Sequence, residues 1–170
     1  MPTTTKQVFF PSMIQDTSII ECKLMDLPTI AKFPSTSEEE WLNCRHFGLR
    51  SADLYILVFD VTSTASFQFI QQMRDEIVSS RDLSNTPIIV AANKSDKADS
   101  ELVREQSRST QDIVSTVRKT WRASYVECSA KHNWNITAMF KEVASEVISH
   151  KENVTKEVEE ENQKCCRIFY

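Results

Sequence analysis

A short polar motif after an apolar run could recognise a guanine base. Asn93, Lys94 and Asp96 come directly after the apolar residues 88–92. An aspartate at such a position can accept hydrogen bonds from both the N1–H and the exocyclic amino group of guanine, a donor pair that adenine lacks. The lysine stem can lie over the base, and the asparagine can join adjacent loops. Taken alone, this four-residue match is equally typical of a polar loop after a strand.

A second motif favours the guanine interpretation. Ser129, Ala130 and Lys131 follow the next short strand-like segment, in the run 127–131. The backbone N–H of Ala130 could meet the guanine O6 atom, and Ser129 could brace the loop. An ordinary strand-to-helix turn is the alternative for this segment by itself. Two such motifs in order, each after its own strand, indicate a guanine-binding site.

The elements that must position these motifs alternate between strand and helix. Apolar runs predict buried strands, and apolar residues spaced three or four apart predict amphipathic helices. The predicted strands span 6–11, 19–25, 53–61, 87–92 and 125–128, and the predicted helices span 37–45, 67–77, 110–121 and 136–148. Ser37 with Glu40 predicts a capping box at the first helix. The pattern is typical of an α/β fold with a mostly parallel sheet, helices on both faces, and ligands at the carboxyl ends of the strands.

A glycine-rich phosphate loop cannot lie within these 170 residues, because they contain one glycine, Gly48. The pattern G-x-x-x-x-G-K-[ST] needs at least two glycines. In such a loop, backbone N–H groups surround the phosphates and a Ser or Thr binds Mg²⁺. The sequence therefore predicts the base-binding half of a nucleotide site without the phosphate-binding half.

The motifs resemble those of Ras-like small GTPases. The stretch 53–148 is similar to the C-terminal two-thirds of such a protein, and the segments 2–4, 26–28, 117–121 and 125–134 are similar to the Ras-like family 10 group. The resemblance covers nearly the whole chain up to about His150. It implies a Ras-like P-loop NTPase fold that binds GTP or GDP with Mg²⁺ and hydrolyses GTP as a signalling switch. The residues that it assigns to the base are Asn93, Lys94, Asp96, Ser129, Ala130 and Lys131.

The same resemblance implies two metal-site residues. Thr3 resembles the switch threonine that meets Mg²⁺, and Asp26 resembles the switch aspartate that holds a metal-bound water. The alternatives are a terminal residue without a ligand for Thr3 and a strand-end cap for Asp26. Thr29 stands where the family has glycine, and no glutamine follows, so no catalytic residue is predicted and hydrolysis is expected to be slow.

In the resembling family, a strand, a phosphate loop and a helix precede the position of Met1. That strand lies between the strands predicted at 19–25 and 53–61. We therefore expect a small GTPase domain over 1–150 that lacks these elements, with a gap in its sheet and marginal stability unless the flanking strands close. Two hypotheses stay open: an incomplete or alternatively started GTPase, and a degenerate pseudo-GTPase that acts as a nucleotide-independent protein-interaction module.

Residues 151–170 read as an acidic tail that ends near the pair Cys165 and Cys166. A prenylation motif needs a cysteine at the fourth position from the end, where this sequence has Arg167. Cysteine pairs can nevertheless carry palmitoyl groups. The net charge of −4 argues against nucleic-acid binding. We expect a cytoplasmic protein with free thiols, whose partners are a guanine nucleotide and effector or regulator proteins. The cysteine pair leaves the inner face of the plasma membrane open as an alternative location.

Overall fold

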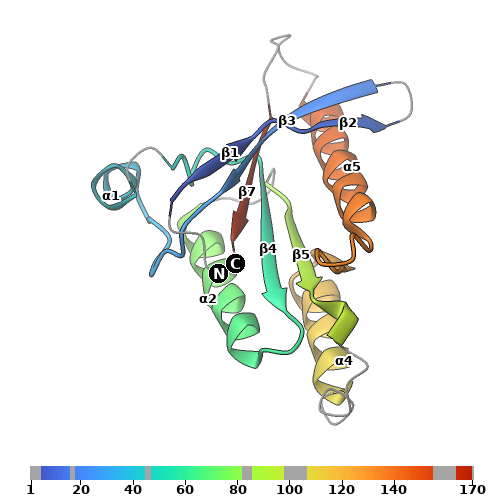
Figure 1. Cartoon of the computed structure of the whole chain (residues 1–170). Helices are drawn as coiled ribbons and strands as arrows, with labels where there is room; N and C mark the ends of the chain where they lie inside the picture. The colour runs from blue at the N-terminus through green and yellow to red at the C-terminus, as the bar shows by residue number, and fades with distance from the viewer. Residues whose placement is uncertain are drawn as a thin grey trace.

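The computed structural model describes residues 5–15, 18–44, 47–81, 86–97, 107–154 and 164–169 (Figure 1). The strands are β1 (Gln7–Phe9), β2 (Ser12–Gln15), β3 (Ser18–Asp26), β4 (Leu54–Asp60), β5 (Ile88–Asn93), β6 (Ser124–Glu127) and β7 (Lys164–Phe169). The helices are α1 (Ser37–Asn43), α2 (Thr64–Ser80), α4 (Ser107–Ser115) and α5 (Ile136–Val154), with a 3₁₀ turn η1 (Ser95–Lys97) and a π-helical segment η2 (Thr116–Thr120) that continues α4.

The strands form one mostly parallel sheet in the order β1-β3-β7-β4-β5-β6, and β2 also pairs with β3. The pairs β3–β7, β7–β4, β4–β5 and β5–β6 are parallel, whereas β1 and β2 run antiparallel to β3. The predicted α/β architecture is therefore confirmed. Because β4, β5 and β6 are parallel, the loops that follow them meet at one edge of the sheet.

Strand β4 is buried on both faces, as its continuous apolar run predicts. Successive side chains of a strand point to opposite faces. Tyr55, Leu57 and Phe59 join a cluster with Ile70, Met73 and Ile77 of α2, whereas Leu54, Ile56 and Val58 join a second cluster with Met139, Val143 and Val147 of α5. The predicted helices on both faces of the sheet are thereby confirmed.

The N-cap residue of helix α1 lies one position before the residue that the sequence pattern predicts. The N-cap is Thr36, whose Oγ1 accepts a hydrogen bond from the backbone N–H of Glu39 at 3.0 Å. The predicted capping box of Ser37 and Glu40 was wrong. Glu40 instead turns toward the following loop, where its carboxylate accepts from the backbone N–H groups of Leu49 and Arg50. This long-range contact is not encoded in the local pattern.

The largest departure from the sequence analysis concerns the C-terminal part of the chain. Helix α5 continues to Val154, and Lys164–Phe169 form β7 in the middle of the sheet rather than part of an acidic tail (Figure 1). Residues Cys22–Asp26 pair with Lys164–Ile168, and Leu54–Leu57 pair with Cys166–Phe169. The position expected to be a gap between β3 and β4 is therefore filled by a strand from the same chain.

Three cysteines in the described part of the chain are buried, namely Cys22, Cys44 and Cys128, and the thiols of Cys44 and Cys128 are free, as predicted. Burial raises the pKa of the Cys128 thiol. These groups pack as small apolar side chains in the two core clusters. Among the described residues, no helix combines the length and the apolar character that a membrane span needs.

Candidate functional site

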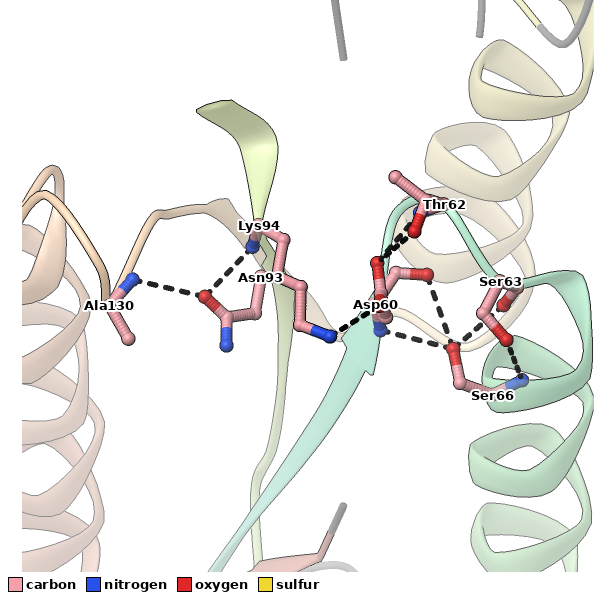
Figure 2. A network of polar contacts seen from close by, with 7 residues as sticks. All are labelled: Asp60, Thr62, Ser63, Ser66, Asn93, Lys94 and Ala130. Atoms are coloured by element: carbon pink, nitrogen blue, oxygen red, sulfur yellow. Dashed lines mark hydrogen bonds and ion pairs between the residues drawn. The ribbon is translucent and has the colours of Figure 1, made fainter. Parts of the chain in front are cut away.

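The carboxyl end of β5 carries the first predicted motif, and Asn93 joins it to the second. The side-chain Oδ1 of Asn93 accepts a hydrogen bond from the backbone N–H of Lys94 at 2.8 Å and another from the backbone N–H of Ala130 at 3.1 Å (Figure 2). Ala130 lies in the loop after β6, so one amide fixes the spacing between the two motifs. The expectation that this asparagine ties adjacent loops is met.

Ser95 adds a second connection between the same loops. Its backbone N–H donates to the carbonyl oxygen of Cys128 at 3.1 Å, and its hydroxyl donates to the same oxygen at 2.8 Å. The backbone N–H of Cys128 donates to the carbonyl oxygen of Ala92 at 2.9 Å. The two loops are therefore joined by backbone as well as side-chain contacts, which limits how far they can separate.

Asp96 is held in place by the second motif. The hydroxyl of Ser129 donates to Oδ1 of Asp96 at 2.6 Å, and Ser129 is only 1% exposed. This hydrogen bond is the main reason that the pKa of Asp96 lies below its ordinary value, although burial acts in the opposite direction. The nearby charges of His132 and Lys131 lower it further, and His132 Nε2 lies 3.8 Å from Oδ2. Asp96 is therefore an ionised acceptor at neutral pH.

Lys94 connects β5 to the end of β4. Its Nζ lies 2.6 Å from Oδ2 of Asp60, and the residue has a left-handed backbone conformation with φ of 64°. The other oxygen of Asp60 accepts from the backbone N–H of Thr62 at 2.9 Å and from its hydroxyl at 2.7 Å (Figure 2). Burial alone would raise the pKa of Asp60, but the hydrogen bonds from Lys94 and Thr62 outweigh it and lower that pKa.

Asp60, Thr62 and Ser66 were missed by the sequence analysis. Ser66 Oγ accepts from the backbone N–H of Asp60 at 3.0 Å and donates to the carbonyl oxygen of Ser63 at 2.7 Å, so it fixes the turn between β4 and α2. An available signal was the aspartate at the end of an otherwise apolar strand, followed directly by hydroxyl residues. Its partner Lys94 lies 34 positions along the chain, and only the pairing of β4 with β5 brings the two together.

The loop after β6 is closed by its own backbone. Ser129 and Trp134 exchange two backbone hydrogen bonds, each 3.0 Å long, and Asn135 Nδ2 donates to the carbonyl oxygen of Glu127 at 3.0 Å. Lys131 lies exposed within this closed loop. Since the N–H of Ala130 already donates to Asn93, a contact with guanine O6 requires that N–H to be shared or exchanged. That contact stays a prediction.

Of the two predicted metal residues, the structure describes Asp26. Asp26 is the last residue of β3 and pairs with Gln7 of β1 and Ile168 of β7. Thr3 lies outside the described residues. Within the described ranges, no group of three or more His, Cys, Asp or Glu side chains could hold a metal ion. Asp26 fits a Mg²⁺ site only of the kind in which one carboxylate acts with water and substrate phosphates.

The predicted lipidation residues lie in β7. Cys165 pairs with Lys23, and Cys166 pairs with Leu24 on one side and Leu54 on the other. Their modification stays a prediction. The sequence pattern gave no indication that their backbone lies in the sheet.

Comparisons with known proteins show which family the chain resembles. The Ras family model matches residues 33–149. The chain is similar to human "Ras-like protein family member 10B", with 36% identity over 149 residues that cover 86% of this chain and 71% of that protein. It is 28% identical to human "Ras-like protein family member 10A" over 145 residues, covering 84% and 69% of the two chains. A "GTP-binding protein Rheb homolog" of Dictyostelium discoideum is 36% identical over 93 residues, which cover 55% and 47%.

Proposed function

This chain belongs to the Ras family of small GTPases, and we propose that it binds GTP and GDP through the loops that follow β5 and β6. The observation that carries the proposal is the hydrogen bond of 2.6 Å from Ser129 Oγ to Asp96 Oδ1. It holds an ionised carboxylate between two loops that Asn93 already joins. The base half of the site is therefore arranged before any ligand enters, which reduces the ordering cost of binding.

Base selection follows from the chemistry of Asp96. An ionised carboxylate accepts hydrogen bonds and donates none. Guanine offers it two donors, whereas adenine has no such donor pair, so the carboxylate would lose hydrogen bonds to water on binding adenine without gaining any from the base. The Lys94 stem provides an apolar surface for the ring, since its ammonium group is held by Asp60.

Mg²⁺ and the phosphates would occupy the second half of the proposed nucleotide site. When bound, Mg²⁺ would neutralise phosphate charge. Asp26 is the described residue that would hold it, through a water molecule, and Thr3 is the second predicted ligand. Because Ile30 and Ala31, and no glutamine that could orient water, come directly after Thr29, we propose that any GTP hydrolysis is slow and that the protein acts as a slow switch.

A second candidate function is a nucleotide-independent protein-interaction module. It is favoured by the large apolar side chains that the β1–β2–β3 part and α1 present to solvent. Phe9 is 48% exposed, Phe10 63% and Trp41 61%. In either case we propose effector or regulator proteins as partners and no nucleic acid. The buried free thiols of Cys44 and Cys128 suit the reducing cytoplasm, and lipidation at Cys165 and Cys166 would add a location at the plasma membrane.

The test is direct titration of the full chain with GDP, ADP and xanthosine diphosphate in calorimetry. We expect GDP to bind and ADP to bind at least about 100-fold more weakly. Asp96→Asn should lower GDP affinity about 100-fold, because two charge-assisted hydrogen bonds are lost at about 1.5 kcal/mol each, and it should favour the xanthine base. Asp112→Asn makes the same chemical change on the exposed face of α4 and should leave affinity unchanged.

The same calorimetric titration distinguishes the two candidate functions. A folded chain that binds neither GDP nor GTP would contradict nucleotide binding and leave the interaction module as the function. Equal affinity for GDP and ADP would show that Asp96 does not select the base. If Asp112→Asn also lowered GDP affinity, the effect of Asp96→Asn could come from a change in the fold and would not be evidence for contact with the base.

A further inference from the structure

His132 lies next to the proposed base-binding residues without being one of them. Its Nε2 lies 3.8 Å from Oδ2 of Asp96, the carboxylate proposed to select guanine. We propose that His132 competes with guanine for this oxygen, so that the base binds best when the imidazole ring is uncharged. This inference rests on the proposed function and adds a residue that controls the same site.

The two oxygens of Asp96 have different neighbours. Oδ1 accepts a hydrogen bond of 2.6 Å from the hydroxyl of Ser129, which is 1% exposed and therefore a fixed partner. Oδ2 lies near the His132 ring, at a distance that suits an ion pair but exceeds a normal hydrogen bond. The side chain of His132 is 57% exposed, whereas that of Asp96 is 16% exposed. Oδ2 is therefore the oxygen whose neighbour a ligand can replace.

Guanine requires both oxygens of the carboxylate. Its N1–H and its exocyclic amino group are parallel donors on one edge of the base. Such a pair matches the two oxygens of a carboxylate, as the parallel N–H groups of an arginine side chain do. A base that binds Asp96 in this way places one donor on Oδ2, the oxygen beside the His132 ring. The base and a charged ring therefore compete for the same acceptor.

The loop after β6 holds the backbone of His132 in place. The backbone N–H of His132 donates to Ser129 Oγ at 3.3 Å, and the same hydroxyl donates to Asp96. Ser129 and Trp134 close the loop with two backbone hydrogen bonds. Because the side chain of His132 is more than half exposed, its rotation into solvent releases Oδ2 without opening the loop.

The charge of the His132 ring decides how strongly it holds Oδ2. The other charged side chains on the segments that meet here are Lys131 in the same loop, Glu127 at the end of β6, Lys94 and Lys97 after β5, and Asp60 at the end of β4. Lys94 is paired with Asp60, and Lys131 is the second cation that acts on Asp96. Histidine is the side chain that ordinarily changes its charge between pH 5 and 8, so the His132 ring is the cation here that a change of pH can remove.

The direction of the pH effect follows from the two charges. The hydrogen bond from Ser129 is the main cause that lowers the pKa of Asp96, so its carboxylate stays ionised between pH 5 and 8. Below neutral pH, a charged His132 ring pairs with Oδ2 and guanine has to displace it. Above neutral pH, the uncharged ring has no such attraction to the oxygen. GDP affinity should therefore fall as the pH falls, by about threefold, because exposed ion pairs are weak.

Calorimetric titration of the full chain with GDP at about pH 8 and about pH 5.5 tests the competition. The terminal phosphate of GDP also changes its protonation in this range, so the ratio of the two affinities is compared between the wild type and His132→Gln, which has no titrating ring. We expect the ratio of affinity at the higher pH to affinity at the lower pH to be about threefold larger in the wild type.

Lys131→Gln is the control for the pH dependence, because it removes a neighbouring cation whose charge does not change in this range. It should keep the wild-type ratio of affinities. An equal ratio in the wild type and His132→Gln, with GDP bound at the higher pH, overturns the competition and leaves base binding intact. A smaller ratio in the wild type overturns it too, because a charged ring would then favour the base.

A double-mutant cycle of His132→Gln and Asp96→Asn tests the pair without any nucleotide. In urea denaturation, the two substitutions should be coupled at about pH 5.5, by about threefold in the unfolding equilibrium constant, and uncoupled at about pH 8. Absence of coupling at both pH values overturns the proposal, because Oδ2 then does not hold the ring. Coupling at the lower pH in a chain that binds no GDP at the higher pH overturns the proposed function, and the competition for the base with it.

Discussion

The two parts of the sheet differ in how many of their candidate ligand-binding residues are held in place by hydrogen bonds. The β4–β5–β6 part contains two mainly apolar strands, β4 and β5, and ends in loops that are joined by Asn93, Ser95 and Ser129. The β1–β2–β3 part exposes large apolar side chains and contributes one predicted metal residue, Asp26. The difference teaches that the residues proposed to bind the base are already joined by hydrogen bonds in one part, whereas the described residues of the other part bring together no such set for phosphate or metal.

The largest effect that the comparison predicts is on stability. Leu57→Ala removes a side chain of β4 that is 0% exposed, and it should lower the free energy of unfolding by about 3 kcal/mol through lost burial and a cavity. Ile19→Ala on β3 removes a side chain that is 71% exposed and should cost less than about 0.5 kcal/mol. Urea denaturation measures both. Similar losses would mean that the two parts are equally well packed.

The next effect is on the connection between the base loops. Asn93→Ala removes the acceptor of two backbone N–H groups, on Lys94 and Ala130, and we expect GDP affinity to fall about tenfold, or about 1.4 kcal/mol. Calorimetric titration measures the change. Asn43→Ala at the exposed end of α1 is the matched control and should leave GDP affinity unaltered. An unaltered affinity in Asn93→Ala would mean that the loops keep their spacing without this side chain.

A smaller effect concerns the ion pair of Asp60 with Lys94. Asp60→Asn should lower stability by about 1 kcal/mol at pH 7, since the Lys94 side chain is 48% exposed and the pair is screened by solvent. Because the pKa of Asp60 is lowered in the folded state, its carboxylate stabilises the fold above its ordinary pKa of 3.8, and this contribution is lost as the pH falls through the folded value.

Urea denaturation at a series of pH values checks this dependence. The stability difference between the wild type and Asp60→Asn should be constant from pH 7 to about pH 5 and should shrink as the pH falls below about 4. A difference that grows as the pH falls would contradict the sign of the pKa shift. A difference that is independent of pH would assign the effect to lost packing.

The smallest predicted effect tests the corrected cap of α1. Thr36→Ala removes the side chain that accepts from Glu39 N–H and should cost about 0.5 kcal/mol, at the low end for an N-cap because the site is exposed. Ser37→Ala, at the cap that the sequence pattern predicts, should cost less than about 0.3 kcal/mol. Thermal unfolding of the two variants side by side measures the difference, and the reverse order would restore the predicted cap.

The sequence by itself determined the alternation of strands and helices and the two motifs after β5 and β6. Both are local signals. The spacing of apolar residues along the sequence distinguishes a strand from a helix, and polar residues that directly follow a buried strand lie at its carboxyl end. From these signals Asn93, Asp96 and Ser129 could be placed in one cluster before the structure was known, because parallel neighbouring strands end at the same edge.

Only the tertiary structure decided which residues support that cluster and what fills the middle of the sheet. The ion pair of Lys94 with Asp60 joins residues 34 positions apart, and the hydrogen bond of Ser129 with Asp96 joins residues 33 apart. Strand β7 follows an acidic stretch and carries Lys164 and Arg167, so its sequence does not identify a central strand, and its position depends on backbone pairing with β3 and β4. The choice of pairing partner depends on tertiary context, so the local sequence pattern of a strand does not predict which strands it pairs with.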